Sequence, residues 1–120
     1  MVHLKTEEEI KWMSEGGQIL QEVVKEIVKD IRPGVKTEYI DKKARDLIVA
    51  KGAETSFDKV PGYKWATCIA INEQIVHTPP SQRVIKDGDV VTVDIGVFHK
   101  GFHTDFATTV LVGDYDERKV

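Results

Sequence analysis

The stretch from residue 90 to residue 113 limits the fold of this 120-residue chain more than any other. It reads VVTVDIGVFHKGFHTDFATTVLVG, and apolar residues alternate with small or polar ones along most of it. This alternation predicts two antiparallel strands joined by a two-residue turn, at His99-Lys100 or at Lys100-Gly101. Either turn places Asp94 and Asp105 on one face of the hairpin, directly opposite with the first turn and diagonal with the second.

The two aspartates repel each other unless a positive charge lies between them. Like charges on one face of a sheet destabilise it, and aspartate is rare inside strands. A divalent metal ion offsets the repulsion, because hard cations prefer carboxylate oxygens. The spacing leaves open a solvated face, on which Asp94 is a surface charge and Asp105 blocks association through an edge strand. An acid in the middle of VTVDIGV favours the metal, so we expect Asp94 and Asp105 to be metal ligands.

The remaining hairpin residues divide between the two faces. The face opposite the acids carries Val91, Val93, Ile95, Val97, Phe102, Phe106 and Val110. This apolar set predicts that the opposite face packs into the core. His103 shares the acidic face, where it is either a third ligand or a residue at the open end of the hairpin.

Composition fits one soluble domain over residues 1–120. Hydrophobic residues make up 41% and charged residues 31%, as in globular proteins, and 120 residues can bury a core. A net charge of −3 with no basic block and no long apolar run gives no reason to expect nucleic acid or a membrane as a partner. The first residues lack the features of a signal peptide, and the single Cys68 has no disulfide partner in the chain, so we expect a cytoplasmic protein.

Two amphipathic helices are predicted before the strands. Thr6 and Glu9 form a capping box, and the helix that follows is expected to end before residue 33. Its apolar stripe is Ile10, Met13, Gly17, Leu20, Val24, Ile27 and Ile31. Thr37 is expected to cap a second helix, with Asp41 near the positive end of the helix dipole and Gly52 at its end. Helices followed by antiparallel strands indicate an α+β fold, in which two amphipathic helices pack on an antiparallel sheet.

A short buried strand is predicted between the helices and the hairpin, over residues 66–71, and a brief extended piece over residues 74–77. His77 follows that piece. A histidine can exchange a proton or hydrogen-bond a substrate near neutral pH, although a lone histidine is more often structural. Cys68 is interpreted as a packing residue, because no base lies near it in the sequence.

Taken together, these motifs resemble the first half of a type I methionine aminopeptidase, a metallopeptidase of the pita-bread (creatinase/aminopeptidase) fold. The resemblance rests on CIAINEQIVH and KDGDVVTVDIGVFHKGFHTDFATTVLVG, and it extends from Thr6 to Gly113. It implies half of that fold, which has two quasi-symmetric halves. It also implies a metal-dependent enzyme that removes N-terminal methionine from proteins or peptides.

The resemblance implies roles for particular residues. Asp94 is expected to be a bidentate ligand of one metal of a pair, and Asp105 to bridge both metals. His77 is expected to be the catalytic and substrate-binding histidine near the scissile peptide nitrogen. Tyr63 and Cys68 are expected to line the pocket for the substrate methionine. The implied cofactors are divalent metal ions, up to two per site, with cobalt, manganese or iron as activators.

Three ligands of the family pattern, a later histidine and two later glutamates, are not found in these 120 residues, and Thr78 stands where the family usually has glycine. Three hypotheses follow. The site is completed by a missing half, or a second copy forms a symmetric homodimer, or the chain is a non-catalytic metal- or peptide-binding half-domain. In the homodimer, Asp94 and Asp105 of both copies give four carboxylates flanked by two copies of His77. An oxygen-rich site of that kind suits manganese, magnesium or calcium better than zinc.

Overall fold

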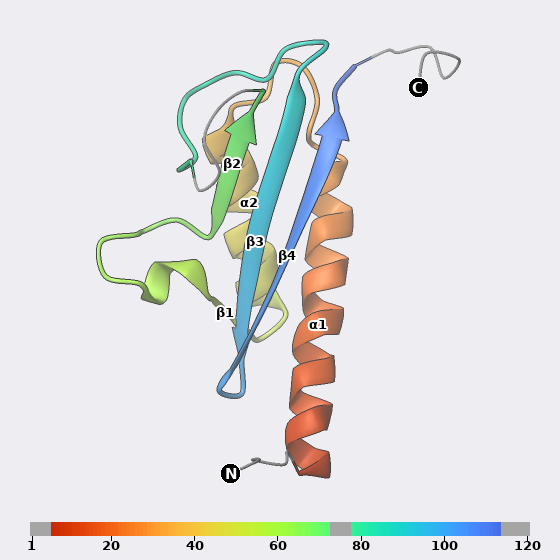
Figure 1. Ribbon diagram of the computed structural model, residues 1–120, viewed down its shortest axis with the longest axis vertical. Helices are drawn as coiled ribbons and strands as arrows, with labels where there is room; N and C mark the ends of the chain where they lie inside the picture. The colour runs from red at the N-terminus through yellow and green to blue at the C-terminus, as the bar shows by residue number, and fades with distance from the viewer. Residues whose placement is uncertain (1–5, 73–77, 114–120) are drawn as a thin grey trace.

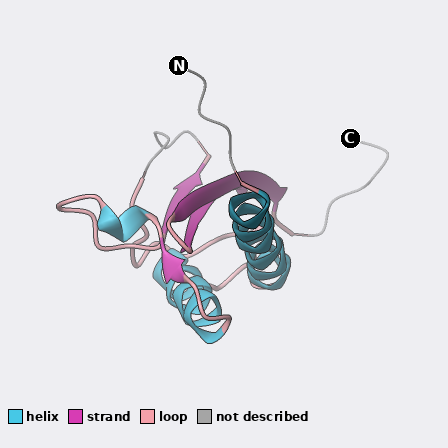
Figure 2. Cartoon of the chain, turned by 90° about the horizontal axis from the view of Figure 1, so that it is seen from below, coloured by secondary structure: helices cyan, strands magenta, loops and turns pink. Residues whose placement is uncertain are grey.

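The computed structural model describes residues 6–72 and 78–113, in which two helices cover one face of an antiparallel sheet (Figures 1 and 2). The elements are α1 (Glu7–Val28), α2 (Thr37–Ala50), β1 (Glu54–Thr55), the 3-10 helix η1 (Phe57–Lys59), β2 (Thr67–Ile71), β3 (Val90–His99) and β4 (Phe102–Leu111). The α+β class and the packing of two helices on the sheet are as predicted. Neither described helix is long and apolar enough to cross a membrane.

Strand β3 is the centre of the sheet. It pairs with β1 and β2 along one edge and with β4 along the other, always antiparallel. The β3–β4 turn falls at Lys100-Gly101, where φ is 53° and 89°. Two positive φ values define the type I′ turn that suits a two-residue hairpin. The second of the two predicted registers is therefore the one observed.

The core lies between the sheet and the helices. On β3 the alternating residues Val91, Val93, Ile95 and Val97 are all buried, as predicted for the face opposite the acids. Phe106 was expected on the same packing face, and it is paired with Ile95, yet its side chain is 49% exposed. The reason is its position on β4, an edge strand that among the described residues has a strand partner on one side only.

Helix α1 begins at the predicted capping box, in which Thr6 Oγ1 accepts from Glu9 N and Glu9 accepts from Thr6 N. Its buried stripe differs from the prediction at several positions: the buried residues are Gly16, Leu20, Val23 and Ile27. Ile10 is 56% exposed, because the first turns of α1 extend beyond the hairpin turn and have no sheet to cover (Figure 1). The helix ends at Val28.

Thr37 does not cap α2, which corrects the sequence prediction. Lys36 occupies the N-cap position, and Thr37 is the first helical residue. The Thr37 hydroxyl accepts from Ser81 N at 2.8 Å and donates to Ser81 O at 3.0 Å. The hydroxyl is used in a contact between segments 44 residues apart, so it is not available for the helix end.

Candidate metal and substrate site

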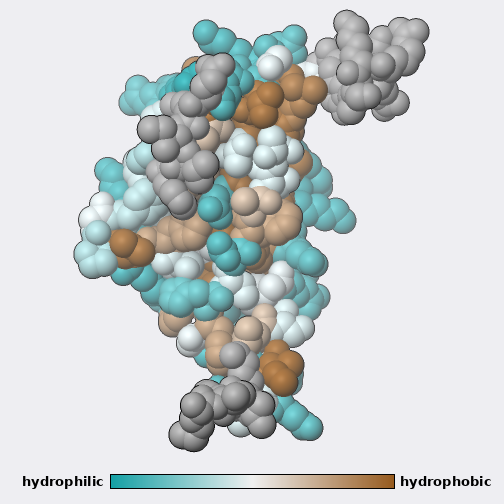
Figure 3. All heavy atoms as spheres, in the orientation of Figure 1, coloured by the Kyte–Doolittle hydropathy of each residue, from teal (hydrophilic) through white to brown (hydrophobic). Residues whose placement is uncertain are grey.

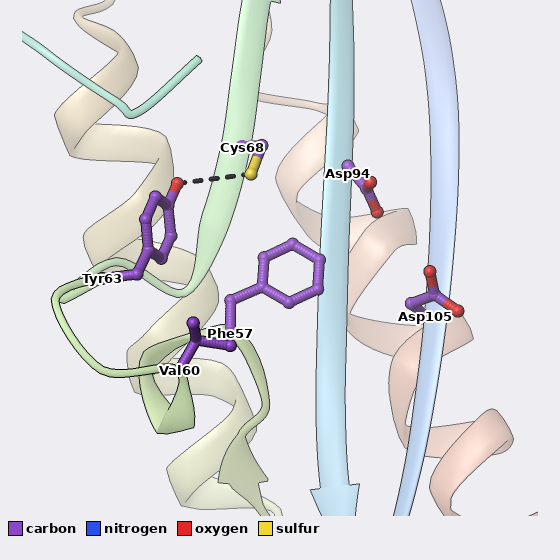
Figure 4. Close-up of a pocket in the computed structure, with 6 residues that line it drawn as sticks. All are labelled: Phe57, Val60, Tyr63, Cys68, Asp94 and Asp105. Carbon is purple, nitrogen blue, oxygen red and sulfur yellow. Dashed lines mark hydrogen bonds between the residues drawn. The ribbon is translucent and has the colours of Figure 1, made fainter. Parts of the chain in front are cut away.

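A pocket of about 350 Å³ opens on the face of the sheet opposite the helices (Figure 4). Its lining residues come from four segments: Phe57, Val60, Tyr63, Cys68, Asp94 and Asp105. Phe57, Val60, Tyr63 and Cys68 lie on one side of the pocket and are mostly apolar, and the two carboxylates lie on the other side. Such a cavity, mostly apolar with a few convergent polar groups, is the usual form of a small-ligand site.

Asp94 and Asp105 share one face of the β3–β4 hairpin, as the alternation predicted. Asp105 pairs with Gly96 and Asp94 pairs with Ala107, so the two aspartates are diagonal neighbours. In Figure 4 both side chains project from adjacent strands into the same region. Diagonal positions on adjacent strands lie close enough for one ion to bind both side chains. The spacing and the oxygen donors both suit a hard divalent cation.

Two carboxylates are the whole of the metal-ligand set that the described residues bring together. No group of three or more histidine, cysteine, aspartate or glutamate side chains is close enough to hold a metal within residues 6–72 and 78–113. His103 is not a third ligand, and it lies near the turn instead of at the open end of the hairpin. It pairs with Phe98, and its Nδ1 lies 2.6 Å from Ser56 Oγ. This hydrogen bond holds the imidazole away from the two carboxylates.

Tyr63 and Cys68 lie side by side in the pocket, as expected. The Tyr63 hydroxyl is 3.3 Å from Cys68 Sγ and donates a hydrogen bond to Thr67 O. Burial raises the pKa of the Cys68 thiol, and the negative charge of Asp94 acts in the same direction. Burial also raises the pKa of the Tyr63 hydroxyl. Both groups therefore stay neutral at physiological pH, which suits a pocket for an uncharged side chain and agrees with the interpretation of Cys68 as non-nucleophilic.

Gly96 makes room for the pocket, a role that was not predicted from the sequence. A Cβ atom at this position would lie 2.7 Å from Phe57 Cε1 and 2.9 Å from Ser56 Cβ. The Phe57 ring therefore rests directly on the backbone of β3, two residues from Asp94. A glycine inside a strand often marks the close approach of another group, and that signal was present in VTVDIGV.

The long-range contacts of Asp41 and Arg45 of α2 were not predicted either. Asp41 was expected to interact with the helix dipole, but one of its oxygens instead accepts hydrogen bonds from Ala66 N, Thr67 N and Thr67 Oγ1, at 3.0, 2.8 and 2.6 Å. Arg45 binds the segment that walls the pocket. His77, the predicted catalytic residue, lies outside the described residues, and so does the extended piece over residues 74–77.

Comparison with known proteins defines the class first. Residues 11–120 match the family model of metallopeptidase family M24. The chain therefore belongs to metallopeptidase family M24.

The curated relatives of this chain include methionine aminopeptidases. A methionine aminopeptidase of Clostridium perfringens is 39% identical over 117 residues, which are 98% of this chain and 47% of that protein. Methionine aminopeptidase 1 of Bacillus subtilis is 38% identical, and the match covers 100% of this chain and 49% of the relative. The chain thus spans about half the length of the curated relatives it matches.

Solved structures give the same fold. The methionine aminopeptidase of Thermotoga maritima superposes with a TM-score of 0.90 at 34% identity, covering 98% of this chain and 48% of that one. The prolidase of Pyrococcus furiosus gives a TM-score of 0.79 at 25% identity, over 96% of this chain and 33% of that one. The resemblance and the half pita-bread fold expected from the sequence are both confirmed.

Proposed function

We propose that this chain, as a single domain over residues 1–120, provides half of a cytoplasmic metal-dependent aminopeptidase that removes N-terminal methionine from proteins or peptides. The observation that carries the proposal is the diagonal pair Asp94 and Asp105 at the edge of a pocket of about 350 Å³. The pair is the metal-binding part of the site. The remainder of the pocket is the substrate-binding part, and His77 is the catalytic and substrate-contacting residue.

The pocket residues suit an unbranched thioether side chain. Methionine is flexible and polarisable, and it makes favourable contacts with aromatic rings. Phe57 and Tyr63 offer such rings, and the neutral Cys68 thiol adds no charge to desolvate. A methionine side chain held there places its own amino end and first peptide bond on the side of Asp94 and Asp105. Divalent ions, when bound, would polarise the scissile carbonyl and lower the pKa of water; cobalt, manganese and iron are the candidate metals.

Two carboxylates leave most coordination positions of a divalent ion to other ligands. We propose that these ligands come either from the missing half of the fold or from a second copy of the chain. The outer edge of β4 supports an added strand, because within the described residues nothing pairs with it. Apolar side chains are exposed along it, with Phe106 at 49% and Leu111 at 45%. Figure 3 shows an apolar patch at the end of the hairpin away from the turn, where Leu111 pairs with Val90.

In a symmetric homodimer the two β4 strands would lie antiparallel across a twofold axis. Such an interface repeats each residue, and in this hypothesis Asp94 and Asp105 of both copies supply four carboxylates to one site. The second candidate function is a non-catalytic half-domain that binds metal or peptides. The pair of carboxylates with no third described ligand favours it, because such a site binds metal weakly.

The test combines light scattering on a size-exclusion peak with metal analysis and an assay for methionine release. Wild-type protein is loaded with Mn²⁺ or Co²⁺ and given the peptide Met-Ala-Ser, alone and with the missing half supplied. The proposal expects metal in the peak and free methionine, both lost in Asp94→Asn and Asp105→Asn. The matched control is Asp46→Asn, an exposed aspartate on α2 far from the pocket residues in the fold.

The outcomes separate the hypotheses. A species of twice the chain mass with metal and turnover supports the homodimer. Turnover only after addition of the missing half supports a divided enzyme. Peptide binding without methionine release under every condition would establish the non-catalytic half-domain and reject the enzyme.

A further inference from the structure

One wall of the pocket comes from residues 56–64, which we call the pocket loop. The loop supplies Phe57, Val60 and Tyr63, half of the residues that line the pocket. Its only regular structure is the three-residue helix η1. A segment with so little internal structure takes its position from contacts with its surroundings, so the groups that hold it also set the shape of the pocket.

Arg45 of α2 binds the pocket loop at two residues and the residue just before the loop at a third. Its Nη1 donates to Asp58 Oδ2 at 2.7 Å and to Thr55 Oγ1 at 3.4 Å, and its Nη2 donates to Lys64 O at 2.7 Å. Thr55 Oγ1 also donates to the same Asp58 oxygen at 2.6 Å. One planar guanidinium thus binds residues before, within and at the end of the loop. Lysine cannot reproduce this pattern, because its ammonium lacks the fixed fork of donors.

Asp41 lies one turn before Arg45 on the same face of α2 and binds the segment just after the loop. Its carboxylate accepts from Ala66 N and from Thr67 N, directly before Cys68. Helix α2 therefore fixes the loop and the start of β2 relative to each other. The distance between Phe57 on the pocket loop and Cys68 on β2 therefore depends on the contacts of α2 with both segments.

We infer that Arg45 is a positioning residue that sets the width of the pocket and thereby its selectivity for the side chain bound there. Loss of Arg45 leaves Asp58 and the Lys64 carbonyl without the donor that joins them. The loop then moves away from Gly96, the Phe57 ring leaves the β3 backbone, and the pocket widens. The substrate part of this inference rests on the proposed function, whereas the widening itself does not.

Cys68 reports the width directly, because it is the only cysteine of the chain, is 7% exposed and lies under Tyr63. The rate of its reaction with N-ethylmaleimide is measured in native buffer. Arg45→Met is expected to react at least fivefold faster than wild type, and Arg45→Lys at an intermediate rate. Asp58→Asn is expected to react faster as well, and the double variant Arg45→Met/Asp58→Asn no faster than Arg45→Met alone.

Two controls separate positioning from general loss of stability. Lys42→Met removes a neighbouring cation of α2 that pairs with the exposed Asp46, and it is expected to leave the rate unchanged. Ile48→Val weakens the buried face of the same helix without touching the loop, and it is also expected to leave the rate unchanged. A wild-type rate in Arg45→Met, or an equal increase in Ile48→Val, would overturn the inference.

The selectivity is read from peptides that differ only at the first residue. For the assembled enzyme, Arg45→Met is expected to raise the KM for Met-Ala-Ser severalfold with kcat nearly unchanged. The ratio of kcat/KM for Met-Ala-Ser over Phe-Ala-Ser is expected to fall. An unchanged ratio in a variant whose Cys68 reacts faster would overturn the selectivity part. If no form of the protein releases methionine, the proposed function fails, and the Cys68 rates still decide whether Arg45 sets the pocket width.

Discussion

Replacing Asp41 with alanine tests whether the attachment of β2 to α2, beside the pocket, depends on one buried carboxylate. Asp41 is 3% exposed, and one of its oxygens accepts all three hydrogen bonds from Ala66 and Thr67. Both partner residues are fully buried, so water cannot easily replace the lost acceptor. Asp41→Ala therefore leaves two backbone amides and one hydroxyl buried without a partner.

The expected loss follows from these three donors. A buried donor left unsatisfied costs about 1–3 kcal/mol, and removal of a buried charged partner typically costs about 3–5 kcal/mol in total. The loss is smaller than a simple sum, because burial of the carboxylate is itself unfavourable, as its raised pKa indicates. We expect Asp41→Ala to lower the free energy of unfolding by about 3–5 kcal/mol. Asp41→Asn keeps an acceptor oxygen and should lose about 1–2 kcal/mol at neutral pH.

The pH dependence of the free energy of unfolding tests the direction of the Asp41 pKa shift. Burial raises the pKa of Asp41 in the folded protein above its ordinary value of 3.8. The folded state then binds this proton more tightly than the unfolded state does. The resulting stabilisation is complete below pH 3.8 and is lost as the pH rises through the folded pKa. The stability of wild type relative to Asp41→Asn should therefore fall with rising pH in that window and then level off.

Urea unfolding followed by circular dichroism, from pH 3 to pH 8, measures both effects, with exposed Asp46→Asn as the control. A loss of less than about 1 kcal/mol in Asp41→Ala would refute the argument from unsatisfied donors. A wild-type advantage over Asp41→Asn that grows with pH would refute the assigned direction of the pKa shift.

Three further substitutions test other parts of the fold. Gly96→Ala should displace the Phe57 ring, because the new Cβ would clash with it. The free energy of unfolding in urea should fall by about 1–3 kcal/mol, and Cys68 should react faster with N-ethylmaleimide. Unchanged values of both would show that the pocket loop does not rest on β3. Gly17→Ala should raise stability by about 1 kcal/mol in thermal unfolding, because its Cβ would meet open space in the middle of α1; a loss would reveal an unrecognised contact. Ile95→Ala should lower stability by about 2–5 kcal/mol in urea, since its side chain is fully buried, and a loss below about 1 kcal/mol would contradict its place in the core.

The hairpin was predictable because its determinants are local. Period-two alternation placed Asp94 and Asp105 on one face, and the same alternation identified the buried face of β3. The turn remained undecided between two positions, because the observed turn needs a positive φ at Lys100 as well as at Gly101. A lysine gives little sequence signal for that conformation.

Two of the six residues that line the pocket were not predictable from the sequence. Tyr63 and Cys68 were expected from family resemblance, but Phe57 and Val60 lie on a loop that is placed by contacts with a distant helix. In the sequence, Asp41 looks like an acid near the start of a helix. Its hydrogen bonds to Ala66 and Thr67 form only when the chain folds. Long-range hydrogen bonds of this kind leave no periodic pattern in the sequence. The role of His77 stays a prediction.

The two carboxylates of the pair stand on backbones of unequal stiffness. Asp94 lies in the strand that is hydrogen-bonded along both edges, so its amide exchanges with solvent only when the sheet opens. Asp105 lies in the outer strand. His99 and Phe102 next to the turn form a hydrogen-bonded pair, and bonded and non-bonded pairs alternate along the ladder. Asp105 and Gly96 are therefore a non-bonded pair, and the backbone amide of Asp105 points away from β3. A strand that pairs with the outer edge of β4 would therefore change the distance between the two carboxylates by moving Asp105, while Asp94 stays in place.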